Sequence, residues 1–195
     1  MTAKLFDDDT AVRFRGEVRE WAQSTLPSSW AAVRGVRLPA EQSLAMRRLW
    51  DKLQRDGGYA GLSWPTEYGG RGLGVIEECI FYEEAARAGA PDTLNFNGMD
   101  LAGPAIIAAG TDEQKEKYLP KILSGEELWC EGFSEPAAGS DLAAVTTTAA
   151  REENSGEFLV NGQKAWTTFA HLADRCYLLC RTVKAHWVLV LAHIP

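Results

Sequence analysis

The feature that most constrains the fold of this chain is a change of hydrophobic periodicity near Gly125. Before it, apolar residues recur with the spacing of amphipathic helices. After it, short runs rich in β-branched and aromatic residues are separated by turn formers, which is typical of strands. Because helices come first and strands follow, the pattern disfavours an alternating β-α-β sheet. We expect an α+β fold, with an N-terminal all-helical domain over residues 1–125 and a partial antiparallel β domain over residues 126–195.

The helical part divides at its glycines and prolines. Acids and N-cap candidates open the first segment, and Gly57-Gly58 ends the second. Thr111, with Gln114 three residues on, predicts a capping box for the last segment. The expected helices cover residues 7–26, 39–56, 74–87, 99–109 (kinked or started by Gly103-Pro104) and a last segment from Thr111 onward. The side chains expected to face inward are Val12, Phe14, Val18, Trp21, Leu26, Leu44, Leu49, Trp50 and Leu53.

The β part contains four strand-like runs. They read "TTTAARE", "EFLVNGQKAWTT", "DRCYLLCRT" and "HWVLVLAHI". Turn signals at Asn154-Ser155-Gly156 and at Asn161-Gly162 separate them or bend them into hairpins.

Composition excludes several classes of function. The formal charge is −7 and the Lys and Arg residues are scattered, so we expect no nucleic-acid partner, which would need a basic patch. No apolar run approaches the ~20 residues of a membrane span, and the first residues lack the pattern of a signal peptide, so we expect a cytoplasmic protein. The four cysteines form no CxxC motif and lie at no metal-ligand spacing with the three histidines. We expect no metal, and expect Cys176 and Cys180 to pack as small apolar side chains.

A glycine-rich run, "YGGRGLG" (Tyr68 to Gly74), suggests a dinucleotide-binding loop at first sight. Gly70 and Gly72 fit the first two glycines of that motif, but the third position falls on Val75 and no strand precedes the run. A loop between helices is the better interpretation.

The segment "LWCEGFSEPAAGSDLA", Leu128 to Ala143, is unusually free of bulky side chains. Pro136 ends any strand that carries Phe133 and Ser134. Ala137, Ala138 and Gly139 would let a ligand approach the backbone, and Gly139 can take a positive φ. Exposed amides and hydroxyls in such a turn can bind an anion, but a simple surface turn explains the same residues equally well.

The segment "NGQKAWTT", Asn161 to Thr168, has a similar ambiguity. If it continues as a strand, Trp166 and Thr168 lie on the same sheet face. The pair could then stack on a flat ring and hydrogen-bond its edge. Trp166 could equally be a core residue.

Together these segments resemble the acyl-CoA dehydrogenases. The matching blocks are "SWPTEYGGRGLG", "LAGPAIIAAGTDEQKEKYLPKILSGEELWCEGFSEPAAGSDLA" and "VNGQKAWTTFAHLADRCYLLCRT", in family order, over residues 10–182. The resemblance implies FAD bound where the helical and β domains meet, with Trp166 against the flavin, Thr168 near its N5 and Ser140 also touching the acyl-CoA substrate. The residues implied to bind the cofactor are Glu131, Gly132, Phe133, Ser134, Glu135, Pro136, Ala137, Ala138, Gly139, Ser140, Trp166, Thr167 and Thr168.

The resemblance also implies a chemistry and partners. The family removes hydrogens from the α and β carbons of an acyl-CoA thioester, and an electron-transfer flavoprotein reoxidises the FAD. Members form homo- or hetero-oligomers and continue into a C-terminal helical bundle that supplies the base. No catalytic residue is therefore assigned here, and Glu67, Glu77, Glu78 and Glu135 match no base position. The alternatives are a non-catalytic flavin-binding or partner subunit, and an acyl-CoA oxidase or flavin monooxygenase on the same fold.

Overall fold

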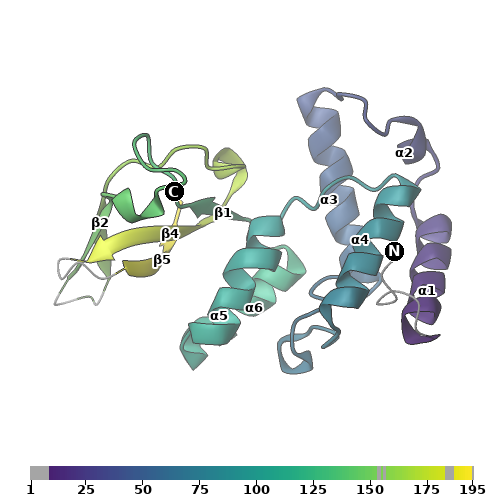
Figure 1. Cartoon of the computed structure of the whole chain (residues 1–195), viewed down its shortest axis with the longest axis horizontal. Coiled ribbons are helices and arrows are strands. Elements are labelled where there is room, and N and C mark those ends of the chain that lie inside the picture. The colour runs from purple at the N-terminus through teal and green to yellow at the C-terminus, as the bar shows by residue number, and fades with distance from the viewer. Residues whose placement is uncertain (1–8, 153–154, 156, 183–186, 195) are drawn as a thin grey trace.

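The protein is divided into a group of helices and a sheet that lie side by side (Figure 1). The computed structural model describes residues 9–152, 155, 157–182 and 187–194. The helices are α1 (Asp9–Thr25), α2 (Ser29–Ala32), α3 (Ala40–Asp56), α4 (Val75–Ala88), α5 (Gly103–Ala109) and α6 (Asp112–Ser124). The strands are β1 (Trp129–Gly132), β2 (Thr148–Arg151), β3 (Phe158–Asn161), β4 (Arg175–Thr182) and β5 (Trp187–His193). In Figure 1, α5 and α6 lie between the sheet and the group α1, α3 and α4.

The expected helices are confirmed at most of their ends. The capping box at the start of α6 forms in both directions, since Thr111 N donates to Gln114 Oε1 at 2.9 Å and Gln114 N donates to Thr111 Oγ1 at 3.2 Å. Gly125 ends the same helix in the left-handed region, with φ 69°, which glycine adopts without steric cost. "YGGRGLG" is a loop between helices, as expected. Residues 7 and 8 of the first expected helix lie outside the described residues.

Three details of the helical part differ from the sequence prediction. The segment expected at 99–109 is divided into a π-helical turn, η3 (Asn97–Ala102), and α5, which has Pro104 in its first turn. The short helix α2 was not predicted. Val12 and Leu49 are exposed, at 55% and 40%. In α1 the buried face includes Ala11 and Ala22 rather than Val12, and in α3 Trp50 is buried while Leu49 is not.

An aromatic cluster forms the core of the helical group. The rings of Trp50 and Phe81 stack at 5.8 Å with 8° between their planes, and Tyr59 stacks on Phe81 at 5.0 Å. Trp21 packs on Tyr59 at 4.4 Å. These contacts join α1, α3 and α4, and they explain why the helical part of the chain carries so many aromatic side chains.

The sheet is mixed. Its central strand is β4, which pairs antiparallel with β5 on one side and parallel with β1 and then β2 on the other, while β2 continues antiparallel to β3. The α+β class, helices first and sheet second, is thus confirmed. The expectation of antiparallel pairing holds for β2–β3 and β4–β5, and it is wrong for the two neighbours of β4 that run parallel to it. Long stretches of chain separate β1 and β2 from β4, and parallel strands require such long connections.

A second correction concerns the hairpin expected at Asn161-Gly162. β3 ends at Asn161, Gly162 is extended with φ 159°, and residues 162–168 form a loop rather than a strand. Trp166 and Thr168 therefore do not share a sheet face. Of the other expected turn, only Ser155 is described; Asn154 and Gly156 lie outside the described residues.

A buried asparagine joins the two parts of the fold. Asn95 follows α4 and is 3% exposed. Its Nδ2 donates to the carbonyls of Ile122 (3.3 Å) and Glu127 (3.1 Å), and its Oδ1 accepts from Trp129 N at 3.0 Å. The end of α6 and the start of β1 are thereby held by one side chain, which determines how the sheet sits on the helices.

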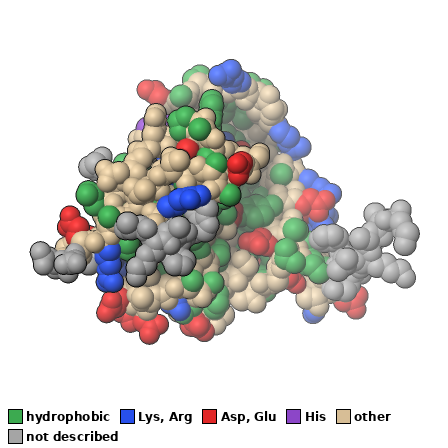
Figure 2. Space-filling model, turned by 60° about the vertical axis from the view of Figure 1, so that its left-hand side comes forward, with side chains coloured by type: hydrophobic (Ala, Val, Ile, Leu, Met, Phe, Trp, Pro, Cys, Tyr) green, Lys and Arg blue, Asp and Glu red, His purple; other side chains and the backbone are tan. Residues whose placement is uncertain are grey.

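The described residues bear on the expectations drawn from composition. None of the described helices is long and apolar enough to cross a membrane. Within the same residues no group of three or more His, Cys, Asp or Glu could hold a metal ion. Cys176 and Cys180 are buried in the sheet, as expected of small apolar side chains. Figure 2 shows blue, basic side chains scattered over the face in view, without a patch.

Candidate functional site

The two segments singled out in the sequence lie against each other. We call Ser134–Asp141 the SEPAAGSD turn and Asn161–Thr168 the tryptophan loop. Ala165 N donates to the carbonyl of Ser134 at 2.9 Å. The side chain of Lys164 reaches the same place, with its Nζ 3.0 Å from the carbonyl oxygen of Phe133. Segments separated by about thirty residues are thus joined by direct hydrogen bonds.

The SEPAAGSD turn is tight and presents small residues outward. Glu135 N donates to Ala138 O at 2.7 Å and Ala138 N donates back to Glu135 O at 3.1 Å. Pro136 and Ala137, between them, are exposed. A Cβ placed on Gly139 would meet no atom within 4 Å, so the glycine leaves open space at the surface. Gly139 does not take the positive φ that the sequence allowed.

The carboxylate of Glu135 holds this turn from behind. Its Oε2 accepts from Thr146 N at 2.8 Å and from Thr146 Oγ1 at 2.7 Å. Its Oε1 accepts from Thr147 N at 2.8 Å and from the Thr147 hydroxyl. Burial by itself would raise the pKa of Glu135, but these hydrogen bonds lower it far below its usual range. The carboxylate stays ionised and is fully engaged with its partners.

Trp166 is the most unusual residue of the site. Its side chain is 91% exposed, so the alternative that it belongs to the core is wrong. Its backbone lies in the left-handed region with φ 61°, and Phe169 does so as well with φ 60°. Non-glycine residues rarely adopt this conformation, and it costs about 1–2 kcal/mol. An exposed indole held in a strained loop indicates a binding surface.

Strand β1 adds a partly buried edge to the site. Phe133 packs on Tyr177 with ring centroids 5.5 Å apart, and Glu131 lies opposite Tyr177 in the register of β1 and β4. Burial raises the pKa of Glu131. The same sheet face carries Trp129, which meets Tyr118 of α6 edge-on at 5.5 Å. The site therefore lies next to the contact between the sheet and the helices.

These residues fit a flat ring with polar edges. Trp166 offers an open π-face, and the exposed hydroxyls of Ser140 and Thr168 are available to polar groups. The small residues of the SEPAAGSD turn leave room for close approach of a ligand to the backbone. This combination suits the isoalloxazine of FAD.

Sequence reasoning missed three residues that shape the site: Thr146, Thr147 and Lys164. The threonines lie in the run "TTTAARE", which was interpreted only as a strand. Lys164 is the one charged residue of "NGQKAWTT", and it is flanked by small or apolar residues on its C-terminal side. A lysine is almost never buried without a partner, so a lysine beside apolar residues could have indicated a buried ion pair.

The acids set aside as bases have structural roles or lie away from the site. Glu77 Oε2 accepts from Gly74 N at 3.0 Å and caps α4. Glu78 accepts from Ser63 Oγ at 3.3 Å, and Glu67 is exposed. None of the three takes part in the SEPAAGSD turn or the tryptophan loop.

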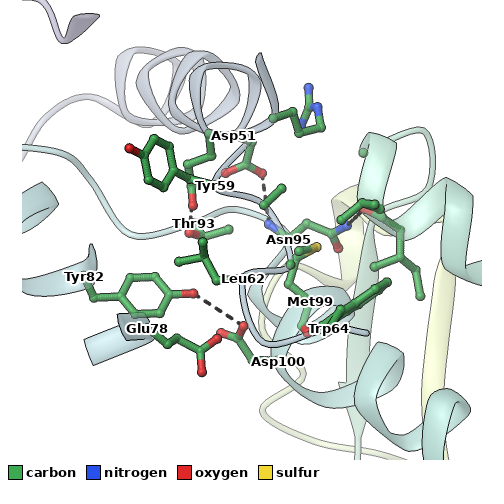
Figure 3. Close-up of a pocket in the computed structure, with 17 residues that line it drawn as sticks. Asp51, Tyr59, Leu62, Trp64, Glu78, Tyr82, Thr93, Asn95, Met99 and Asp100 are labelled. Atoms are coloured by element: carbon green, nitrogen blue, oxygen red, sulfur yellow. Dashed lines mark hydrogen bonds between the residues drawn. The ribbon is translucent and has the colours of Figure 1, made fainter. Parts of the chain in front are cut away.

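A separate cavity lies inside the helical group (Figure 3). Tyr82 points toward Asp100, with 3.5 Å between Tyr82 Oη and Asp100 Oδ1, and Glu78 lies beside them. The cavity measures about 30 Å³. That volume holds water but not a cofactor, so this cavity is not the flavin site.

Comparison with known proteins gives two family matches. The model described as "Acyl-CoA dehydrogenase, N-terminal domain" matches residues 8–126. The model described as "Acyl-CoA dehydrogenase, middle domain" matches residues 130–195. Between them they cover both the helical group and the sheet.

Individual relatives agree with these matches. Acyl-CoA dehydrogenase IpdE1 of Mycobacterium tuberculosis is 46% identical over 173 residues, which are 88% of this chain and 44% of the relative. Among solved structures, the Tcur3481-Tcur3483 steroid ACAD is 32% identical with a TM-score of 0.79, covering 98% of this chain and 49% of that one. The ChsE4-ChsE5 complex of Mycobacterium tuberculosis is 33% identical with a TM-score of 0.76, covering 95% and 47%. The chain spans about half the length of the relatives it matches.

Proposed function

The chain belongs to the acyl-CoA dehydrogenase family, and on that premise we propose that it provides the FAD-binding surface for α,β-dehydrogenation of an acyl-CoA thioester. The helical and β parts would act as separate domains with their boundary near Gly125, which the two family matches support. The cofactor would lie on the SEPAAGSD turn and the tryptophan loop.

The observation that carries this proposal is the exposure of Trp166. A side chain of this size that is 91% exposed and held at φ 61° gains nothing for the fold. A ring stacked on it would remove its apolar surface from water. The SEPAAGSD turn, which Ala165 joins by a hydrogen bond, offers small residues and an exposed hydroxyl at Ser140.

Each part of the site has a distinct task in this proposal. FAD, when bound, supplies the acceptor for the hydride that leaves the β carbon. Trp166 would orient the ring, and Thr168 would hydrogen-bond its edge. The backbone of residues 131–140 would help to hold the cofactor, and Ser140 would contact the thioester substrate as well. These residues bind and orient; they do not move the α proton.

We assign no base among these residues. Glu135 is ionised but its lone pairs are occupied by threonine donors, so it cannot reach a substrate proton. Glu67, Glu77 and Glu78 lie elsewhere, as described above. We infer that the α proton is taken by a carboxylate of another segment or another chain, so these 195 residues alone would show no dehydrogenation.

The names of the relatives suggest a substrate class and an assembly. One solved relative is a steroid ACAD whose name joins two proteins, Tcur3481 and Tcur3483, and another is a complex of ChsE4 with ChsE5. We propose that this chain handles a bulky, steroid-type acyl-CoA, and that it works in a hetero-oligomer with electrons passing to an electron-transfer flavoprotein.

Flavin binding is the direct test. Gly139→Val adds bulk to the exposed side of the SEPAAGSD turn, where no atom lies within 4 Å of the new Cβ. We expect the variant to keep the stability of the wild type and to bind FAD about 10-fold or more weakly because of the clash. Binding is measured by equilibrium dialysis against FAD with visible absorbance as readout.

Gly16→Val is the matched control, because Gly16 also has open space around its Cβ position but lies on α1. Equal FAD binding by Gly139→Val and Gly16→Val would contradict the proposed site. Once the segment or chain that supplies the base is present, an assay with a steroid-type acyl-CoA, run in air with and without an artificial electron acceptor, distinguishes a dehydrogenase from an oxidase.

A further inference from the structure

We propose that Glu135 and Lys164 form a positioning pair, which sets the separation of the SEPAAGSD turn and the tryptophan loop before FAD binds. The inference rests on the proposed function, because it explains how the flavin surface is held ready. It assigns a role to Lys164, and it places the action of Glu135 behind the turn rather than in contact with the cofactor.

Lys164 connects the two segments through two bonds. Its Nζ lies 3.0 Å from Glu135 Oε1 and 3.0 Å from the carbonyl oxygen of Phe133. Glu135 belongs to the SEPAAGSD turn and Phe133 directly precedes it, whereas Lys164 belongs to the tryptophan loop, two residues before Trp166. The side chain of Lys164 is only 11% exposed, so water does not compete effectively for these bonds.

Glu135 extends the connection to a third segment. Its side chain is 5% exposed, and both oxygens accept from the backbone and hydroxyls of Thr146 and Thr147. The turn, the tryptophan loop and the entry to β2 thus meet at one carboxylate. A buried charge of this kind is costly to strip of its partners, so the three segments have one strongly preferred arrangement.

The adjoining backbone shows what the pair controls. Directly after Lys164, Ala165 N donates to Ser134 O at 2.9 Å, and Trp166 follows at φ 61°. With Lys164 fixed, Ala165 and then Trp166 are placed relative to the turn. Without it, the strained conformation of Trp166 loses the contacts that maintain it.

The test begins with a measurement that needs no FAD. In Lys164→Met we expect the amide of Ala165 to exchange hydrogen about 10-fold or more faster than in the wild type, while the amides of β4 stay protected. Arg175→Met is the matched control, since it breaks another largely buried pair, Arg175–Glu127 at 3.0 Å, in which neither Lys164 nor Glu135 takes part. The control should leave the exchange of the Ala165 amide unchanged.

FAD affinity is the second measurement, taken by titration at equal fractions of folded protein. We expect Lys164→Met and Glu135→Gln to weaken FAD binding about 10- to 100-fold, as loss of outer partners does at other ligand sites. Lys164→Arg keeps the charge and should restore much of the affinity. If Lys164→Met does not fold, the Glu135→Gln/Lys164→Met double variant replaces it, because it removes both buried charges.

The outcomes separate this inference from the proposed function. Unchanged exchange at Ala165 overturns the positioning pair, whatever FAD does. Faster exchange with unchanged FAD affinity overturns its role in flavin binding. Faster exchange in Lys164→Met together with no FAD binding by the wild type leaves the pair standing and contradicts the proposed function instead.

Discussion

At the scale of single residues, Trp166 departs from what the fold alone would favour. Apolar side chains of this size are mostly buried, and non-glycine residues mostly avoid positive φ. Trp166 follows neither tendency, because its side chain is 91% exposed and its φ is 61°. Both departures fall on one residue next to the SEPAAGSD turn, and the flavin site proposed above gives a reason for both.

Replacing this residue should separate binding from stability. Trp166→Gly removes the indole and relieves the positive φ, so we expect the free energy of unfolding without ligand to change by less than about 1 kcal/mol. FAD affinity should fall about 10-fold or more with the loss of stacking. Urea unfolding and FAD titration measure the two quantities. Trp166→Phe, which keeps a ring, should retain more affinity than Trp166→Gly; the reverse order would argue against stacking.

At the scale of elements, Asn95 determines how β1 follows α6. Three of its side-chain bonds go to backbone groups of these two elements or of the chain between them. Its own backbone N–H donates to Asp51 Oδ2 of α3 at 3.2 Å. Removing the side chain would leave buried backbone groups without partners, which costs more than the loss of an exposed bond.

We therefore expect Asn95→Ala to lower the free energy of unfolding by about 2–4 kcal/mol. Thr111→Ala, which removes only the exposed cap of α6, should cost about 1 kcal/mol. Urea denaturation of the two variants beside the wild type gives the comparison. A loss for Asn95→Ala no larger than that for Thr111→Ala would show that the junction is held mainly by apolar packing.

At the scale of the whole molecule, the response to acid depends on a buried cluster in the helical group. Glu84 has a side chain only 2% exposed and accepts from Arg19 at 2.9 Å and Arg15 at 2.7 Å. The hydrogen bond from Arg19 is the largest cause that lowers the pKa of Glu84 to about 2, from an ordinary value of 4.5. Because the folded value lies below the unfolded one, the stabilisation is present above about pH 4.5 and is lost as the pH falls toward 2.

The size of this acid effect can be measured. The lowered pKa of Glu84 corresponds to a stabilisation on the order of 3 kcal/mol. Asp51 opposes this stabilisation in part, because burial raises the pKa of Asp51. We expect the free energy of unfolding to fall as the pH is lowered from 5 to about 2. Urea titrations at each pH measure this fall. Glu84→Gln should lower stability at neutral pH and flatten this dependence. A slope as steep in Glu84→Gln as in the wild type would assign the acid response to other carboxylates, such as Glu135.

Several features of this protein could be predicted from the sequence because they depend on neighbours along the chain. The order of helices and strands follows from hydrophobic periodicity. The capping box of Thr111 and Gln114 and the helix end at Gly125 are set within a few residues. The family resemblance also rested on local motifs, and it singled out the two segments that the structure brings together.

Other features were decided only by the tertiary structure, because they depend on contacts between distant segments. The parallel pairing of β1 with β4, the bonds of Asn95 and the pair of Glu135 with Lys164 each join residues about thirty or more positions apart. Hydrophobic periodicity does not encode which distant polar group a buried side chain will meet. For the same reason the tryptophan loop was mistaken for a strand: its conformation is held by Lys164 and Ala165 on the SEPAAGSD turn, and local propensity gives way to such contacts.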